Sequence, residues 1–503
     1  MESFIDRVVN VSDFIWGGTW NGVQVLPFPP MVVILLGTGL FFMVGLRFYP
    51  LTRIGAAFQS LVGRDRKGSG EGGEISPFAA LSTALSGQVG TGNLAGVATA
   101  ISLGGPGAIF WMWVTALIGM ALAFAEGALA VRYREKTPEG SFRGGPMTYI
   151  QMGLGPRWRW LAILFCIGTL FSALVTGNGI QANSVADSIH ELTGLDDAIG
   201  GAIVAALVFI VIVGGIRSIG AVAERIVPVM AGAYILMALI AILLDIGSMP
   251  ETFARIFAGA FSPQAASGGF LGAAVIMAIR AGVARGLFSN EAGQGSTPIA
   301  HAVARTDDPE KQGRFAMMGT FIDTIVICTM TALVLLTVEG QFTHRLADGT
   351  LEAVPHAWQS DLSGFAMTSG AFAAAFPLAV AGIPAGTLVA SVALILFVFT
   401  TLLTWSYYGE RAITFLYDQV PGASAAGERR LHLAWRILWC LAIWVGSFQD
   451  LTLVWRLGDI ANAAMALPNL VALIALSGVV FALARGDRRA GPEHPLKPVK
   501  FRL

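Results

Sequence analysis

Apolar stretches of about 20 residues recur along this chain, and they constrain its fold more than any other feature. A stretch of that length, wound into a helix, crosses the roughly 30 Å hydrocarbon core of a bilayer. Only 13% of the 503 residues are charged, whereas soluble domains carry about 25%. The mean hydropathy is correspondingly high, at +0.68. These features predict an integral membrane protein. They exclude a soluble enzyme, a secreted disulfide scaffold, a disordered chain and a nucleic-acid-binding protein.

Eleven membrane-spanning segments are predicted, which makes the protein an all-α polytopic membrane protein. Their approximate ranges are 27–48, 75–103, 106–133, 158–186, 199–216, 224–247, 268–300, 315–338, 384–410, 432–448 and 451–485. The second, seventh and eleventh are rich in Gly, Asn, Ser or Pro, so we expect them to depart from regular helices.

Two segments outside these spans also carry a pattern. Within residues 1–26, apolar residues at helical spacing between Phe4 and Trp16 indicate a short helix in the membrane interface. Residues 339–383 turn from polar to rich in Gly, Ala and Phe. This segment is predicted either to fold over the outer face or dip into it, or to form a loose loop.

The basic residues are divided unevenly between the two sides of the membrane. With the N-terminus outside, most of the 32 Lys and Arg fall in loops of the opposite side, and only Arg7, Arg255 and Arg345 lie in outer segments. Cytoplasmic loops are enriched in Lys and Arg. The distribution therefore predicts a plasma membrane protein, of the bacterial inner membrane, with its N-terminus outside and its tail, 486–503, in the cytoplasm.

Glycines interrupt the second span, whose centre reads Ser-Gly-Gln-Val-Gly-Thr-Gly-Asn over residues 86–93. Each glycine weakens a helix by about 1 kcal/mol relative to Ala, so we expect an unwound turn at 90–93. Freed N–H groups at a helix start bind anions, and freed carbonyls bind cations. An amino-acid carboxylate and a sodium ion meet these two needs. The alternative is that the glycines serve close helix packing, for which Gly92 and Gly96 have suitable spacing.

A second interruption lies five spans later, at 286–298, and includes three glycines, Pro298 and Glu291. Spans two to six (75–247) and seven to eleven (268–485) then form two sets of five, each opening with a broken helix. Because five is odd, the second set is inverted relative to the first. Residues 27–74 supply an extra first span and a cytoplasmic loop. Paired interruptions in two halves indicate a transporter binding site.

Three runs, at 86–93, 104–119 and 284–296, resemble the most specific stretches of the alanine/glycine:cation symporter family, the sodium:alanine symporters. The resemblance extends over nearly the whole chain. It implies a leucine-transporter-type 5+5 inverted repeat, coupling to sodium or sometimes to protons, and alanine or glycine as substrate. It implies a transporter that is not an enzyme and has no cofactor besides the coupling ion.

In this architecture the first break is expected to bind the substrate carboxylate through backbone amides, and the second break to lie near its amino group. Trp405 is expected to limit the side-chain pocket, unless it is an aromatic anchor at the membrane interface. Gln181 either contacts the substrate or holds helices together. The expected substrate-binding residues are Gly90, Thr91, Gly92, Asn93, Gln181, Phe288, Ser289, Asn290, Thr401 and Trp405.

Adjacent hydroxyls at Thr400 and Thr401 are candidate sodium ligands, since sodium prefers hard oxygen donors. The resemblance implies that the carbonyls of Ser86 and Val89 complete this site. The alternative is that each Thr bonds back to the carbonyl one turn earlier. Thr404, one turn further, is assigned to helix packing.

Ionisable residues inside spans are functional candidates by default. They are Glu126, Arg280, Arg285, Glu291, Asp323, Arg456 and Asp459. No pair among them is predicted. A proton-coupled or exchanging carrier of the same fold, with Glu291 or Glu126 titrating, remains the alternative function. An intramembrane enzyme is disfavoured because no HExxH or GxSxG motif lies in a span, and the oligomeric state stays open.

Overall fold

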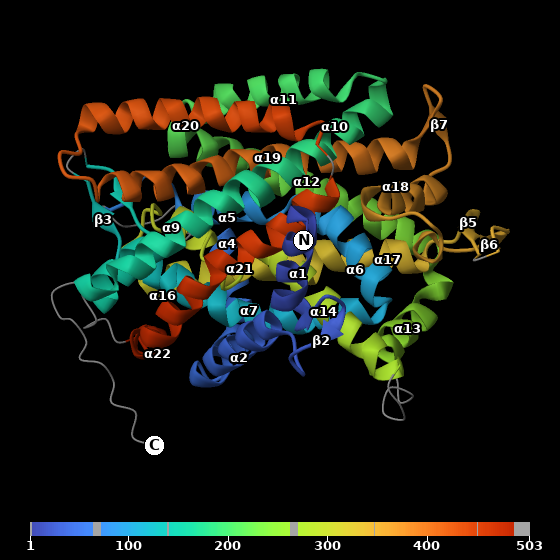
Figure 1. Ribbon diagram of the computed structural model, residues 1–503, viewed down its shortest axis with the longest axis horizontal. Helices are drawn as coiled ribbons and strands as arrows, with labels where there is room; N and C mark the ends of the chain where they lie inside the picture. The colour runs from blue at the N-terminus through green and yellow to red at the C-terminus, as the bar shows by residue number, and fades with distance from the viewer. Residues whose placement is uncertain are drawn as a thin grey trace.

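The structure, a computed structural model, describes residues 3–63, 72–137, 140–261, 270–346, 348–449 and 451–486. Its helices are α1 (Phe4–Gly17), α2 (Pro30–Gly45), α3 (Tyr49–Thr52), α4 (Ile54–Val62), α5 (Pro77–Gln88), α6 (Val97–Gly104), α7 (Gly107–Arg132), α8 (Pro146–Tyr149), α9 (Arg159–Leu174), α10 (Ile180–Thr193), α11 (Asp197–Ile212), α12 (Gly215–Leu244), α13 (Met249–Phe261), α14 (Phe270–Asn290), α15 (Thr297–His301), α16 (Pro309–Thr320), α17 (Thr329–Thr337), α18 (Gly364–Ala375), α19 (Ala385–Tyr417), α20 (Ala425–Gly446), α21 (Leu451–Ala475) and α22 (Ser477–Ala484). Most long helices run in roughly the same direction, along the long axis of the molecule (Figure 1).

Helices occupy every predicted span. Six helical stretches are long and apolar enough to cross a membrane, namely Gly107–Arg132, Pro156–Thr193, Gly215–Leu244, Pro309–Thr337, Ala385–Tyr417 and Leu453–Ala475. The helices α2 and α11 are apolar but shorter, at 16 residues each. The mostly helical membrane protein is therefore confirmed, whereas the number of eleven crossings and the inverted repeat remain predictions.

The breaks in the second and seventh spans lie where the glycine runs predict them. In the second span, α5 ends at Gln88 and a π-helical turn begins at Gly92. In the seventh, α14 ends at Asn290 and α15 begins at Thr297. The eleventh span is more regular than expected, because α21 continues through Pro468 to Ala475 before α22 begins.

One predicted boundary is wrong by about nine residues. The sixth span was expected to begin near 224, but α12 begins at Gly215, directly after α11. Gly215 has a positive φ of 64°, a conformation that favours glycine. This single residue makes the tight turn that the sequence pattern assigned to a longer loop.

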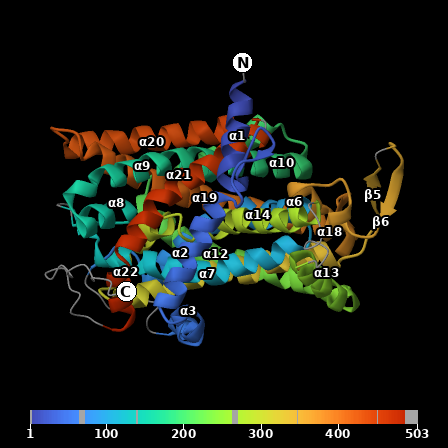
Figure 2. The ribbon, with the colours of Figure 1, turned by 60° about the horizontal axis from the view of Figure 1, so that its bottom comes forward.

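The N-terminal helix α1 runs across the direction of the spanning helices (Figure 2). Ser3 and Asp6 form a capping box that starts it. Its contacts with α2 and α21 bury Trp16, of which only 3% is exposed. The predicted helix is present, and its C-terminal end packs against the helix bundle.

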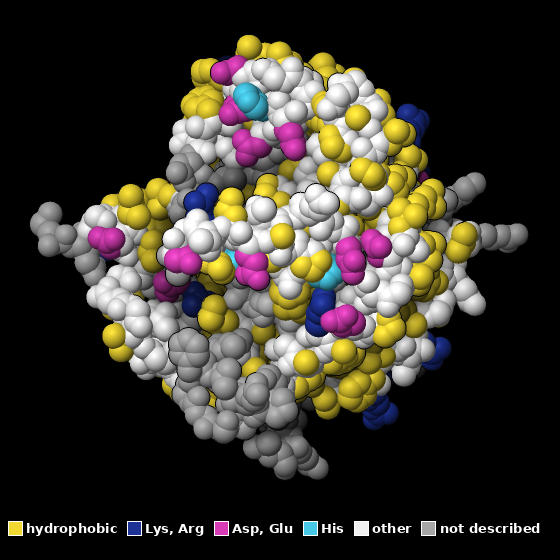
Figure 3. All heavy atoms as spheres, turned by 90° about the vertical axis from the view of Figure 1, so that its right-hand side faces the viewer, with side chains coloured by type: hydrophobic (Ala, Val, Ile, Leu, Met, Phe, Trp, Pro, Cys, Tyr) yellow, Lys and Arg dark blue, Asp and Glu magenta, His cyan; other side chains and the backbone are white. Residues whose placement is uncertain are grey.

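The segment 339–383 is ordered rather than a loose loop. The antiparallel hairpin of β5 (Phe342–Arg345) and β6 (Leu351–Val354) precedes α18, and the short hairpin of β7 (Ala379–Val380) and β8 (Ile383–Pro384) follows it. The hydroxyl of Thr368 on α18 donates to the carbonyl of Leu94, 3.1 Å away, so the segment packs on the first break. Acidic side chains outnumber Lys and Arg on this end of the molecule (Figure 3).

Candidate functional site

The first break lies against α19 and against the start of α10, which follows η5, a π-helical turn at Val175–Gly179. A Cβ added to Gly90 would lie 2.6 Å from Thr401 Oγ1 and 2.9 Å from Gln181 Oε1. A Cβ on Gly92 would lie 2.9 Å from the Phe288 ring of the second broken helix. The glycines therefore serve close approach of the two breaks and α19 as well as unwinding.

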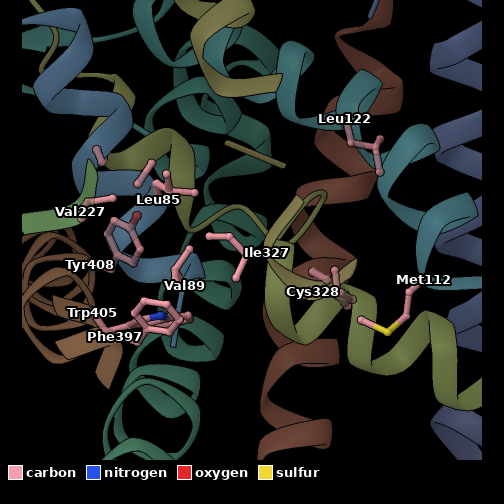
Figure 4. Close-up of a cluster of buried hydrophobic side chains, with 14 of the residues drawn as sticks. Leu85, Val89, Met112, Leu122, Val227, Ile327, Cys328, Phe397, Trp405 and Tyr408 are labelled. Atoms are coloured by element: carbon pink, nitrogen blue, oxygen red, sulfur yellow. The ribbon is translucent and has the colours of Figure 1, made fainter. Parts of the chain in front are cut away.

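Four oxygens converge beside the end of α5. Thr401 Oγ1 lies 3.0 Å from the Ser86 carbonyl oxygen and 3.1 Å from that of Val89. It also lies 2.9 Å from the carbonyl oxygen of Phe397, one turn earlier on α19, which is the bond back along the helix that the alternative predicts. One hydroxyl has one hydrogen to donate, so it cannot satisfy three acceptors at once. Figure 4 shows Val89 with Phe397 and Trp405 of α19. This buried, oxygen-rich arrangement has the chemistry of a site for a hard cation.

The structure brings Thr401 to the predicted sodium-ligand carbonyls but leaves Thr400 apart from them. Thr400 Oγ1 lies 3.0 Å from the Phe397 carbonyl and 3.8 Å from Met230 Sδ, because successive residues of a helix face different neighbours. Thr404, assigned to helix packing, joins α19 to α5 next to the oxygen cluster. Its hydroxyl lies 2.5 Å from Ser86 Oγ and 3.1 Å from the Thr83 carbonyl.

Two backbone amides of the first break already hold side-chain oxygens. The Gly90 amide donates to Asn93 Oδ1 at 2.9 Å, and the Thr91 amide donates to Gln181 Oε1 at 3.1 Å. The Thr91 hydroxyl also donates to Gln181, at 2.9 Å. Both amides that were expected to bind a carboxylate therefore face amide oxygens, which a charged oxygen could replace with stronger hydrogen bonds.

Asp323 joins the two breaks, a role that sequence reasoning missed. Its carboxylate accepts from Asn93 Nδ2 at 2.6 Å, from Ser289 Oγ at 2.8 Å and from Thr324 Oγ1 at 2.7 Å. Asn290 contacts the same group of residues through Thr324, at 3.2 Å. Asp323 is fully buried, and within the part of the chain that the structure describes it has no cationic partner. Its only sequence signal was an isolated acid in an apolar run.

A π-helical stretch, Phe321–Cys328, presents Asp323 and Thr324 to the breaks. Such irregularities within helices frequently occur at functional sites because they redirect side chains. No composition or periodicity in the sequence indicates this stretch.

Trp405 lies in the protein interior, with 2% of its surface exposed, and is not an interfacial anchor. Its indole N–H donates to Glu291 Oε1 at 2.9 Å. A Cβ on Gly177 would lie 2.4 Å from its ring, so η5 packs directly on the indole face. Figure 4 shows Trp405 and Tyr408 together on α19, next to Val89.

Glu291 and a second buried acid, Glu126, flank the break in the seventh span. Ser296 also donates a hydrogen bond to Glu291, which itself has a positive φ of 55°. Glu126 accepts from the Gly293 amide at 3.2 Å and from Asn469 Nδ2 at 2.7 Å. Among the described residues, neither carboxylate is paired with Lys or Arg.

Phe288, on the second broken helix, has different neighbours from Trp405. Its ring centroid is 4.8 Å from that of Trp455, and the Arg285 guanidinium sits over both rings. Arg285 also bonds to Asp459 at 3.1 Å. Phe288 therefore packs against Trp455 and Arg285, whereas Trp405 packs against η5 and bonds to Glu291.

The N-terminal helix extends this group of charges outward. Asp13 bonds to Arg280 and to Arg456, each at 2.6 Å, and so joins α1 to α14 and α21. Trp16 donates to the Asp459 carbonyl at 3.0 Å. Three of the intramembrane arginines thus have acidic partners, in what we name the outer network: Asp13, Arg280, Arg285, Arg456 and Asp459.

At the other end, backbone contacts tie the two broken helices together. Ile75 and Ala304 form a parallel bridge, and the Arg305 amide donates to the Ile75 carbonyl at 2.8 Å. Arg134 donates to the carbonyls of Ala304 at 2.6 Å and Thr306 at 2.7 Å. These contacts connect the two broken helices at the end of the site opposite the outer network.

Comparisons with known proteins find similar sequences over nearly the whole chain. The sequence profile described as "Sodium:alanine symporter family" matches residues 16–491. The "Sodium/alanine symporter AgcS" of Methanococcus maripaludis is 41% identical over 95% of this chain and 96% of its own length. The "Putative sodium/proton-dependent alanine carrier protein YrbD" of Bacillus subtilis is 37% identical over 93% of this chain and 92% of its own.

A solved structure, that of MhsT in complex with L-phenylalanine, is similar in fold. Its TM-score is 0.54 at 12% identity, over 81% of this chain and 90% of MhsT. At that identity the likeness shows the fold alone, which is of the leucine-transporter type.

Proposed function

Because the chain belongs to the sodium:alanine symporter family, we propose that it imports a small neutral amino acid, alanine or glycine, together with sodium. The observation that carries this proposal is the convergence of the Thr401 hydroxyl with the carbonyls of Ser86, Val89 and Phe397. An ion there takes the place of hydrogen bonds that a single hydroxyl cannot all make. Because these ligands are neutral oxygens, the ion can bind without a charged side chain in the first break.

The substrate binds beside this ion, between the two breaks. Its carboxylate takes the amides of Gly90 and Thr91 after the side-chain oxygens of Asn93 and Gln181 turn away. Its ammonium group lies toward Asp323, whose carboxylate has neutral donors only. One sodium ion, one zwitterion and one aspartate together carry no net charge, which keeps the loaded site compatible with the membrane interior.

Transport proceeds by alternating access, with the N-terminus outside. The outer network opens to admit substrate and sodium, and the backbone bridge between Ile75 and Ala304 opens to release them inside. One sodium ion moving through about 100 mV supplies roughly 2.3 kcal/mol. At about 1.4 kcal/mol per tenfold, this supports accumulation of roughly fiftyfold before any sodium concentration gradient is counted.

Uptake into proteoliposomes tests this function. Alanine and glycine uptake is expected to require an inward sodium gradient and to stop when potassium or choline replaces sodium at fixed pH. The buried acids Glu291 and Glu126 favour one competing function, a proton-coupled or exchanging carrier. Uptake that ignores sodium and follows an acid-outside pulse would establish that alternative.

A further inference from the structure

A cleft of about 220 Å³ opens where α2 and α22 end, far from the two breaks. Three arginines, Arg47, Arg53 and Arg485, contribute to its lining, together with the aromatic side chains of Tyr49 and Phe481. A site of this size accommodates a group much larger than a water molecule.

The cleft is strongly positive. No Asp or Glu lines it, and the structure gives its three arginines no ion pair among the residues it describes. The carboxyl ends of α2 and α22 each contribute about half a negative charge, which offsets only about one of the three guanidinium charges. Among the described residues, Glu310 reaches the lining of the cleft by accepting a hydrogen bond from Tyr49, and it also lies 3.8 Å from Arg314.

The backbone is strained at this place. Arg47 and Phe48 have φ values of 53° and 58°, and they are two of only five non-glycine residues with positive φ in the described chain. Such conformations are unfavourable for residues that carry a Cβ, and they cluster at functional sites. Here the strained turn reverses the chain after α2, so that Arg47 and Arg53 line the same cleft.

The surroundings of the cleft indicate a lipid rather than a free ion. Leu40 and Val44 on α2 are 52% and 56% exposed, and Phe48 is 48% exposed, so apolar surface leads from the spanning helix to the cleft. Acyl chains fit along that surface, and guanidinium groups bind phosphate oxygens through paired hydrogen bonds. Basic pockets between helices at the membrane surface bind anionic headgroups.

We propose that this cleft binds the headgroup of an anionic phospholipid, with Arg47, Arg53 and Arg485 contacting its phosphate. The proposal does not depend on the transported substrate or on the coupling ion.

Binding of phosphatidylglycerol to the purified full-length protein in neutral detergent micelles tests the proposal, measured by native mass spectrometry over a lipid titration. The variant combines Arg47→Gln, Arg53→Gln and Arg485→Gln. A matched control combines Arg157→Gln, Arg429→Gln and Arg430→Gln, which removes the same charge from exposed arginines outside the cleft. Monodispersity in phosphatidylcholine nanodiscs verifies folding of both.

We expect the cleft variant to bind phosphatidylglycerol roughly 10- to 100-fold more weakly than the wild type. The control is expected to stay within about twofold, since its arginines line no apolar cleft. Equal losses in the two variants would overturn the proposal, because binding would then follow total charge. Displacement of the lipid by millimolar inorganic phosphate would also overturn it, in favour of a free-anion site. If the triple variant does not fold, Arg485→Gln alone is expected to weaken binding several-fold, and an unchanged affinity would count against the proposal.

Discussion

The two broken helices resemble each other in sequence but use different chemistry. At the glycines of the first break the contacts come from neutral groups, the amides of Gly90 and Thr91 and the oxygens near Thr401, whereas Asn93 just beyond them donates to the carboxylate of Asp323. Around the second, two fully buried acids, Glu291 and Glu126, accept hydrogen bonds from neutral donors. Under the proposed function, the first break binds the ion and the carboxylate, whereas the second break provides fixed structure through the hydrogen bonds to its two buried acids.

The first break depends on close approach, so Gly90→Ala should have the largest effect on transport. The added Cβ meets Thr401 Oγ1 at 2.6 Å and Gln181 Oε1 at 2.9 Å, and α19 must shift to relieve the clash. Overpacking of this kind costs about 1–3 kcal/mol. We expect sodium-driven alanine uptake to fall by about 100-fold.

Gly96→Ala is the control for that prediction. A Cβ there meets nothing closer than the Thr91 carbonyl at 3.9 Å, and alanine favours the helix. Uptake close to that of the wild type is expected. If the two variants lose uptake equally, the glycines of the first break serve helix flexibility and not close approach.

Trp405 bonds to Glu291 of the second break. The size of the Trp405 side chain is expected to set which substrate side chains fit the binding site. Trp405→Leu should admit leucine and weaken alanine binding, because the vacated volume no longer packs against a methyl group. One methylene in such a pocket is worth 10- to 200-fold in preference. Binding of both amino acids to purified protein measures the ratio.

Trp405→Phe separates bulk from hydrogen bonding, since it removes the N–H that reaches Glu291. It is expected to keep most of the preference for alanine. Trp439→Leu, an equally buried tryptophan on α20, is expected to lower the yield without moving the ratio. A ratio unchanged in Trp405→Leu would remove this residue from the pocket.

At the neutral oxygen cluster, Thr401→Ala is expected to have a smaller effect than the substitutions of Gly90 and Trp405. The variant loses one oxygen ligand, an interaction with a charged group worth about 1.5–3 kcal/mol. Apparent sodium affinity is expected to fall at least tenfold with little change in maximal rate. Thr401→Ser, which keeps the hydroxyl, should restore it.

Thr400→Ala serves as the neighbouring control, because the Thr400 hydroxyl shares the Phe397 carbonyl with Thr401 and contacts Met230, whereas only Thr401 contacts the carbonyls of Ser86 and Val89. The sodium dependence of uptake, measured for Thr401→Ala, Thr401→Ser and Thr400→Ala, shows whether each hydroxyl is an ion ligand or packs the helix. Similar losses for Thr400→Ala and Thr401→Ala would mean that both hydroxyls are structural.

At the second break, Glu291→Gln should have a smaller effect than Gly90→Ala, Trp405→Leu or Thr401→Ala. The amide keeps the shape and one acceptor but loses one of the two hydrogen bonds from Trp405 and Ser296. A neutral hydrogen bond is worth about 0.5–1.5 kcal/mol, so a two- to tenfold reduction in sodium-driven uptake is expected. Abolished uptake, together with loss of any response to external acid, would shift the coupling role to the second break.

The positions of the breaks could be predicted from the sequence because they depend on local chemistry. Closely spaced glycines, Gly90 with Gly92 and Gly293 with Gly295, weaken helices wherever they occur in a chain. The apolar stretches predicted the spans for the same reason, since their length and hydropathy are local properties. The resemblance of the motifs to one family supplied the substrate class.

Other features depend on how distant segments pack, and only the tertiary structure decided them. Asp323 joins Asn93 and Ser289 because a π-helical stretch turns it toward both breaks. Asp13, in the N-terminal helix, bonds to arginines some 270 and 440 positions away in the chain.

The sequence by itself thus determined that the chain is a mostly helical membrane protein and where two helices break. It also marked Thr400 and Thr401 together as ion ligands, since composition cannot tell which side of a helix meets a partner. The structure separated them, because residues that are adjacent in a helix point about 100° apart and only Thr401 faces the open end of α5. Contacts between helices are set by relative rotation and depth, which the linear sequence does not encode in any local pattern.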